Sequence, residues 1–506
     1  MEIHPGTMSL AEMRTLFESD GKISLPHKAW EAVDAAAATV ADALAGDRTV
    51  YGVNTGFGRL AQQAIPRDQL TQLQRNLVLS HAVGTGPDLD DPTARLVIAL
   101  KVNSLARGNS GVRRIVVERL MDLLERDVVP CLPSKGSVGA SGDLAPLAHL
   151  AAVLMGVGRA RHGGEVMPAA DALARAGLET LELGPKEGLA LINGTQVSTA
   201  LALAALFAAE RAFAAAVVAG ALSVDAAQGS DTPFDSRIHQ LSGHVGQREI
   251  AESLRQLLKG SAIRQSHIAC TKVQDPYCLR CQPQVLGACL DHLRFAADAL
   301  AIQGNAVSDN PLIFPEPGDV LSGGNFHAEP VAMASDTMAL AIAEIGGLSE
   351  RRIAMLIDTT ISGLPPFLVA EPGLNSGFMV AHVTAAALAS ENKQLATPAS
   401  VDSLPTSANQ EDHVSMATNA ARRLGAMCEN TAGIIAIELL AAVQGIEFHE
   451  DLETSTSLKK ASALVRGVAD PYVQDRYFAP DIEAVTTLVR DGAFIPFAKG
   501  LLPSHR

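Results

Sequence analysis

The stretch VSTALALAALFAAERAFAAAVVAGALSV, residues 197–224, is the most apolar part of this 506-residue chain. Alanine and leucine dominate it, and both residues favour helix. Glu210 and Arg211 interrupt the stretch near its middle, where charged side chains are costly in a lipid bilayer. The pattern therefore predicts a long helix that is buried in a protein core rather than a membrane span.

Further long helices are predicted on the C-terminal side of this stretch. Leu286, Leu290 and Leu293 recur at the spacing of one helical face. Similar apolar spacing continues in three later stretches, at residues 328–357, 376–391 and about 411–443. Such helices are apolar on nearly all sides, so they must pack against other helices. The sequence predicts a mostly α protein built around a long-helix bundle that is buried further by self-association.

The N-terminal part of the chain has a different pattern. Two shorter helical stretches, residues 27–46 and 91–108, each end at a glycine, which commonly stops a helix. The loop YGVNTGFG, residues 51–58, lies between them. We therefore predict a smaller N-terminal lobe at residues 1–195 and a helical region at residues 196–506 that contains the long-helix bundle.

The charge balance limits the partners of the protein. The formal net charge is −15, and no block of lysine and arginine overturns it locally. A chain of this charge repels nucleic-acid phosphates and anionic lipids. The first residues also lack the basic and apolar sections of a signal peptide. We expect a cytoplasmic protein that binds neither nucleic acid nor membranes.

The cysteines and histidines show no recognisable metal pattern. Cys278 and Cys281 form a CxxC pair, but no second Cys/His pair follows at zinc spacing. The sequence also lacks the P-loop, EF-hand and HExxH motifs. We predict no dedicated metal site and interpret His149, His327 and His413 as structural residues.

The stretch GSVGASGDLAPLAHL, residues 136–150, places three of the smallest residues directly before an apolar helix. One interpretation is a tight turn in which Ser141 or Asp143 caps that helix. In a tighter bend, however, the nitrogen of Gly142 can reach the carbonyl carbon of Ala140, because glycine has no side chain to obstruct the approach. Ring closure and the loss of two waters, the second from Ser141, would give a methylidene-imidazolone. Such a ring is a strong electrophile made from the chain alone.

The same stretch resembles the signature of the ammonia-lyases that carry this methylidene-imidazolone (MIO) ring. More blocks resemble the histidine ammonia-lyase family, in the same order along the chain: YGVNTGFG (51–58), NLVLSHAVGTG (76–86), LINGTQ (191–196), VQDPYCLRCQPQ (273–284), NAVSDNP (305–311), SGGNFHAEP (322–330), LPPFLV (364–369), NSGFM (375–379) and SVDSLPTSANQEDHVSM (400–416). The resemblance implies the long-helix fold of the fumarase/aspartase-like superfamily. It also implies an MIO formed from Ala140, Ser141 and Gly142, with no external organic cofactor.

The resemblance further implies roles for residues around the ring. Tyr51 matches the family's catalytic tyrosine, whose phenol needs local electrostatic help to act as a base. Asn193 and Tyr277 resemble residues that hydrogen-bond the ring oxygen and the substrate amine. Gln274 matches another polar residue beside the ring, and Phe326 matches an aromatic residue that packs there. Taken singly, these side chains could equally be ordinary loop, helix-end or core residues.

Three more residues are implied to hold the substrate. Arg280 resembles a clamp for the α-carboxylate. His81 and Glu411 match residues that face a substrate imidazole, which implies L-histidine as substrate and trans-urocanate and ammonia as products. The alternatives are a surface role for Arg280, a satisfied buried histidine at His81, and an acid favoured in the first turn of a helix at Glu411, after a Ser407/Gln410 capping box.

Other functions stay open at this stage. The nearest alternative keeps the ring and acts on tyrosine or phenylalanine, as an ammonia-lyase or an aminomutase, although those relatives tend to carry NQD where this chain has NQED. A remote alternative is an inactive structural relative, which would be expected to lose Ser141, Tyr51 or Arg280 first. The resemblance also implies a homotetramer with active sites shared between subunits.

Overall fold

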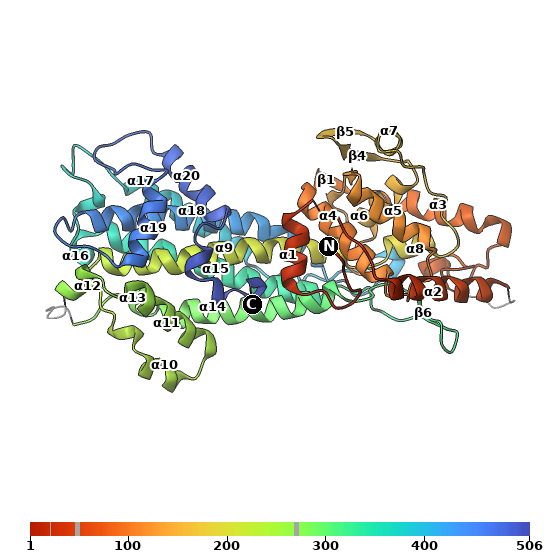
Figure 1. Ribbon diagram of the computed structural model, residues 1–506, viewed down its shortest axis with the longest axis horizontal. Helices are drawn as coiled ribbons and strands as arrows, with labels where there is room; N and C mark the ends of the chain where they lie inside the picture. The colour runs from red at the N-terminus through yellow and green to blue at the C-terminus, as the bar shows by residue number, and fades with distance from the viewer. Residues whose placement is uncertain (21, 46–50, 268–272, 506) are drawn as a thin grey trace. The chain divides into compact units, whose positions relative to one another are not determined.

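Helices make up most of the protein in this computed structural model, which describes residues 1–20, 22–45, 51–267 and 273–505 (Figure 1). The described residues divide into two compact units, each assembled from three segments. Unit 1 consists of Met1–Ala204, Ala297–Asp336 and Pro398–Arg422, and unit 2 of Ala205–Ala296, Thr337–Thr397 and Arg423–Arg506. The first passage between them lies close to the predicted boundary after residue 195. The sequence did not indicate the later returns to unit 1, and the division into domains stays a prediction.

Unit 1 combines helices with short antiparallel strands. Helices that lie wholly within it are α1 (Leu10–Glu18), α2 (His27–Ala45), α3 (Leu70–His81), α4 (Asp91–Leu105), α5 (Arg114–Glu125), α6 (Leu144–Leu154), α7 (Ala169–Arg175) and α8 (Glu187–Ile192). Its strands are β1 (Thr85–Asp88), β2 (Val129–Pro130), β3 (Pro133–Lys135), β4 (Arg159–His162), β5 (Glu165–Pro168), β6 (Leu312–Phe314) and β7 (Asp319–Leu321). They form the sheets β1-β3, β2-β4-β5 and β6-β7. The prediction of a mostly α protein is confirmed.

The long helices contribute residues to both units. They are α9 (Gln196–Ala226), α14 (Gln282–Gly304), α15 (Glu329–Ile357) and α18 (Ala417–Glu447). Helices wholly within unit 2 are α10 (Ser236–Ser242), α11 (Val245–Leu258), α12 (Ala262–Ser266), α13 (Tyr277–Arg280), α16 (Thr359–Ser362), α17 (Met379–Leu395), α19 (Thr456–Arg466) and α20 (Ala479–Arg490). The predicted bundle of long helices is therefore present.

A buried ion pair joins the long helices within unit 2. Glu438 of α18 accepts hydrogen bonds from Arg352 of α15, and neither side chain is exposed to solvent. The hydroxyls of Ser223 (2.7 Å) and Ser349 (2.6 Å) also donate to this carboxylate. Removing two charges from water is costly, so such a pair persists only when further hydrogen bonds satisfy it. The pair thereby fixes the register of α9, α15 and α18, which run side by side here (Figure 1).

The apolar helices lie in the interior of the fold. By length and composition alone, α9, α15 and α18 could each cross a membrane. However, 78%, 67% and 78% of their most apolar windows are buried in the structure. The apolar stretch at residues 197–224 is therefore part of a core helix, as predicted.

Two helices that were predicted from local sequence agree well with helices of the structure. The helix predicted at residues 27–46 is α2, although its glycine stop, Gly46, lies outside the described residues. The helix predicted at residues 91–108 is α4, and Gly108 follows it with a φ of +75°. A left-handed glycine after the last turn is the usual helix stop.

Candidate active site

The bend before α6 requires glycine at position 142. Gly142 has a φ of +76°, and a Cβ placed on it would lie only 2.3 Å from the carbonyl oxygen of Gly194. The next residue, Asp143, donates its backbone N–H to the same oxygen at 2.7 Å. The backbone of the small-residue segment is thus held directly against the loop that follows α8.

Asp143 holds this bend from within the core. Its side chain is fully buried and accepts hydrogen bonds from Ser137 Oγ (2.9 Å) and Thr418 Oγ1 (2.6 Å). It also accepts from the backbone N–H (2.7 Å) and hydroxyl (2.9 Å) of Ser198, in the first turn of α9. Asp143 precedes α6 but makes no capping bond to it. Asp143 therefore occupies the predicted N-cap position of α6, but its carboxylate is directed to α9 and α18 and makes no capping bond.

Ser141 lies in a large pocket of unit 1, with a volume of about 1430 Å³. This volume is ample for an amino acid. Seven of the eleven residues predicted for the site line this pocket: Tyr51, His81, Ala140, Ser141, Asn193, Phe326 and Glu411. The chain thus brings together residues that are widely separated in sequence, while their individual roles stay predictions.

The Ser141 hydroxyl is held by a carboxylate. Ser141 Oγ donates to Glu411 Oε1 at 2.5 Å, while Thr406 (2.6 Å) and Ser407 (2.9 Å) donate to the other carboxylate oxygen. Burial alone would raise the pKa of Glu411, but these three hydroxyls and the nearby His81 outweigh it and lower the pKa below 4.5. Glu411 is therefore ionised at neutral pH.

The prediction that Glu411 lies in the first turn of a helix is wrong. Helix α18 begins only at Ala417, and residues 407–409 form a separate 3₁₀ turn. Met416 has a φ of +56° and donates its backbone N–H to Val138, in the segment that precedes the bend. This tertiary contact prevents the helix from starting earlier. The capping-box explanation for the acid at position 411 therefore does not apply.

Asn193 also contacts the backbone of the bend. It follows α8, is buried, and donates its Nδ2 to the carbonyl oxygen of Ser141 at 2.8 Å. Its own Oδ1 is buried and has no hydrogen-bond partner among the described residues. A buried acceptor without a hydrogen bond lowers the stability of the folded protein, so the site favours a group that donates to it.

Two other pocket residues are oriented by local contacts. His81 ends α3, and its Nδ1 lies 2.7 Å from the carbonyl oxygen of Leu77. A carbonyl only accepts, so this bond places a proton on Nδ1. Tyr51 accepts a hydrogen bond from the backbone N–H of Gly58 at 3.3 Å and packs edge-on against Phe57.

Four predicted residues do not line the pocket: Gly142, which forms the bend, and three residues of unit 2. Gln274, Tyr277 and Arg280 belong to unit 2. Tyr277 is 69% exposed, and the Arg280 guanidinium lies 4.7 Å from the centre of its ring. These three residues are not among those that line the Ser141 pocket of unit 1.

Sequence reasoning missed a buried lysine behind the site. Lys101 of α4 is 1% exposed and donates to the carbonyl oxygens of Ala190 (3.2 Å) and Asn193 (2.8 Å), at the end of α8. A cation is favoured at a helix C-terminus. Burial nevertheless lowers the pKa of Lys101 to about 7, despite the opposing attraction of Asp309. A lysine inside the apolar run VIALKVNSL was the available signal.

We expect Lys101 to make the stability of the protein depend on pH. Between pH 7 and pH 10.5 the unfolded chain binds a proton at this lysine that the folded chain does not. The free energy of unfolding should therefore rise with pH in this window, by up to about 1.4 kcal/mol per pH unit, and the cost of the buried charge is fully present below it. Lys101→Met should lack this contribution. Urea unfolding of both proteins across the window tests this, and parallel stability curves would contradict it.

Three pocket residues outside the predicted set also emerge. His327, Glu329 and His413 line the same pocket, and the sequence had suggested only structural roles for the two histidines. His149, the third histidine interpreted in this way, accepts a hydrogen bond from the backbone N–H of Gly84 at 3.2 Å. That contact fits a structural role for His149.

Comparison with known proteins shows the family of this chain. Residues 8–467 match the family described as aromatic amino acid lyase. The histidine ammonia-lyase of Aromatoleum aromaticum is 63% identical over 492 residues, which cover 97% of this chain and 94% of that protein. The histidine ammonia-lyase structure from Trypanosoma cruzi has a TM-score of 0.91 and 40% identity, over 99% of this chain and 95% of that one.

A tyrosine aminomutase from Streptomyces globisporus is also similar. It has a TM-score of 0.92 and 35% identity, over 97% of both chains. The shared fold therefore accommodates different substrates, and the substrate has to be argued from the pocket. The family match and the identity over nearly the full length confirm the family resemblance that the motif blocks predicted. The chain belongs to the aromatic amino acid lyase family.

Proposed function

We propose that the protein is a carbon–nitrogen lyase that converts L-histidine to trans-urocanate and ammonia. The observation that carries this proposal is the pocket in which Ser141, in its glycine-containing bend, lies against ionised Glu411 and near His81. A carboxylate and an imidazole suit a substrate that bears an imidazole, because they can accept or donate its ring protons. The identity of 63% to a histidine ammonia-lyase supports the same substrate.

We further propose that Ala140, Ser141 and Gly142 form the MIO group that members of this family use. A bond forms between Gly142 N and the carbonyl carbon of Ala140, the carbonyl oxygen leaves as water with the N–H protons of Gly142 and Ser141, and a double bond forms between that carbon and Ser141 N. Ser141 then loses its Oγ and its Cα proton as a second water. The residues fit this group, because Gly142 has no Cβ, Asp143 holds the bend, and Asn193 Nδ2 donates to the Ser141 carbonyl oxygen, which would become the ring oxygen.

The other pocket residues then act on the substrate itself. Once formed, the ring supplies an electrophile that eases departure of the amino group. Tyr51 is proposed as the base that removes the β-proton, and Glu411 and His81 hold the imidazole. Phe326 forms an apolar wall of the pocket.

We propose that Gln274, Tyr277 and Arg280 complete the pocket of a neighbouring subunit in a homotetramer. The high exposure of Tyr277, 69% in the isolated chain, is consistent with coverage by another subunit. Arg280 would then hold the α-carboxylate through its planar guanidinium. We also propose a cytoplasmic location, because the net charge of −15 and the buried apolar helices suit a protein that binds neither membranes nor nucleic acid.

The test of this function is ammonia release from L-histidine, with L-tyrosine and L-phenylalanine measured under the same conditions. We expect equal amounts of ammonia and urocanate from L-histidine and little ammonia from the other two. Release from tyrosine or phenylalanine alone would overturn the substrate assignment but keep the lyase chemistry. Formation of a β-amino acid without free ammonia would identify an aminomutase instead.

A further inference from the structure

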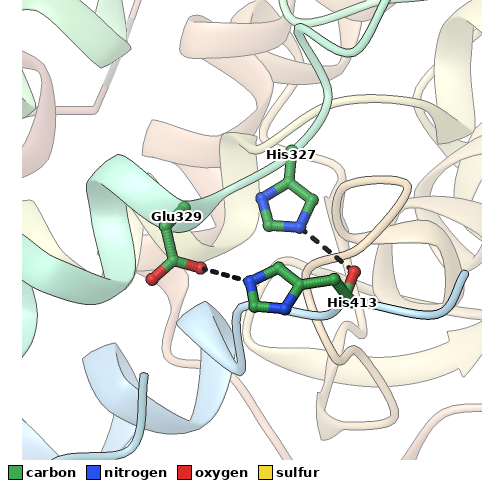
Figure 2. Close-up of side chains that lie close together, drawn as sticks. All are labelled: His327, Glu329 and His413. Atoms are coloured by element: carbon green, nitrogen blue, oxygen red, sulfur yellow. Dashed lines mark hydrogen bonds and ion pairs between the residues drawn. The ribbon is translucent and has the colours of Figure 1, made fainter. Parts of the chain in front are cut away.

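A second cluster of side chains lies in the wall of the Ser141 pocket. It consists of His327, Glu329 and His413, and one potential ligand atom from each lies within 4.8 Å of the other two (Figure 2). His327 and Glu329 lie at the start of α15, while His413 belongs to the segment before α18. The two imidazole rings stack nearly parallel, with an interplanar angle of 10° and a centroid separation of 5.7 Å. None of these residues has a role in the lyase reaction proposed above.

Each imidazole has one nitrogen turned to an oxygen. His327 Nε2 lies 3.2 Å from the carbonyl oxygen of His413, and His413 Nδ1 lies 3.3 Å from Ser403 Oγ. The carbonyl only accepts, so His327 Nε2 carries the proton and Nδ1 keeps a free lone pair. Ser403 Oγ already accepts from the backbone N–H of Val414 (2.9 Å) and can accept the Nδ1–H of His413 as well. Metal-binding histidines are typically held in this way through their other ring nitrogen.

Glu329 supplies a carboxylate oxygen that makes no hydrogen bond and only a long ion-pair contact. Its Oε2 is shielded from solvent and makes no hydrogen bond among the described residues. The nearest cationic candidate, His413 Nε2, is 3.9 Å away, which is beyond hydrogen-bond distance. A shielded carboxylate oxygen without a donor is costly, and a cation between the oxygen and the imidazole nitrogen would remove that cost.

We propose that His327, Glu329 and His413 bind one divalent transition-metal ion of the Zn²⁺ and Co²⁺ class. Two imidazoles and one carboxylate suit these ions, which hold such ligands at about 2.0–2.2 Å. The three ligand atoms lie within 4.8 Å of one another, so binding requires them to move closer together around the ion. Three protein ligands leave at least one coordination position for water or for a ligand in the pocket. This site departs from the sequence-based expectation, and it is independent of the proposed lyase function.

Co²⁺ binding to the chelator-treated protein tests the proposal. Calorimetry should give one Co²⁺ per chain, and visible absorption should show the bands of a coordinated ion. His413→Ala, His327→Ala and Glu329→Gln should each weaken binding by at least about tenfold. The side chain of His413 is 67% exposed, so its replacement leaves the core intact, and circular dichroism of each variant checks folding.

Two matched variants separate this site from other His and Glu pairs. His382 lies 2.8 Å from Glu350 in unit 2, so His382→Ala removes a comparable pair outside the pocket and should leave Co²⁺ binding unchanged. Glu411→Gln should also keep Co²⁺ binding. The proposal is overturned if the wild-type protein binds no Co²⁺, if the three cluster variants bind like wild type, or if Glu411→Gln alone removes binding. Because no substrate is present, these results do not depend on ammonia release.

Discussion

Ser141→Ala should reduce ammonia release from L-histidine by at least about 1,000-fold while the chain still folds. Alanine has no Oγ to lose, so the second loss of water cannot occur and no methylidene carbon forms. The change removes one hydroxyl at the pocket surface and leaves the Asp143 hydrogen bonds that hold the bend. Activity with L-histidine and intact mass should therefore change together, with little change in the free energy of unfolding.

Ser322→Ala is the matched control for this variant. Ser322 also lines the pocket but lies on an exposed part of its wall. This control variant should still lose two water molecules when the ring forms, and it should keep the activity of the wild-type protein. If the Ser141→Ala variant releases ammonia at a near wild-type rate, the reaction does not need a ring formed from Ser141, and the MIO proposal is wrong.

Glu411→Gln should lower turnover of L-histidine by about 100-fold or more. Glutamine keeps the shape of the side chain but removes the negative charge that Thr406, Ser407 and His81 stabilise. The free energy of unfolding should fall by less than about 2 kcal/mol, because the remaining carbonyl oxygen still accepts and no helix cap is lost. Steady-state kinetics and urea unfolding of the same preparation measure the two effects.

The neighbouring Asp412→Asn variant provides the control for Glu411→Gln. Asp412 also lines the pocket, and its side chain is exposed. We expect near wild-type activity from it. If Glu411→Gln instead loses activity only in proportion to folded protein, the carboxylate has a structural role and the assignment of the substrate imidazole fails.

The core helices could be predicted because their signal is local. The stretch 197–224 specifies α9 through its own composition, and residues 27–45 and 91–105 specify α2 and α4 through apolar spacing and glycine stops. The start of α18 could not be predicted in this way. Its apolar spacing extends upstream, but Ser415 donates to Gly139 and Met416 to Val138, so distant backbone decides where the helix begins.

The site shows the same division between local and distant causes. Small residues before α6 suggested the bend, and ordered motif blocks suggested which residues accompany it. The partners that make the bend rigid come from elsewhere, since Ser198 and Thr418 hold Asp143 and Lys101 holds Asn193. The His327–Glu329–His413 cluster has no linear spacing motif either, because 86 residues separate its two histidines. Only folding brings such groups together.

The most direct test of the central claim is the intact mass of the purified wild-type chain. We predict a mass lower than that of the printed sequence by two water molecules, with the deficit confined to the peptide that contains residues 136–150. A folded protein that releases ammonia from L-histidine and still has the full sequence mass would contradict the proposal that Ala140, Ser141 and Gly142 form the reactive ring.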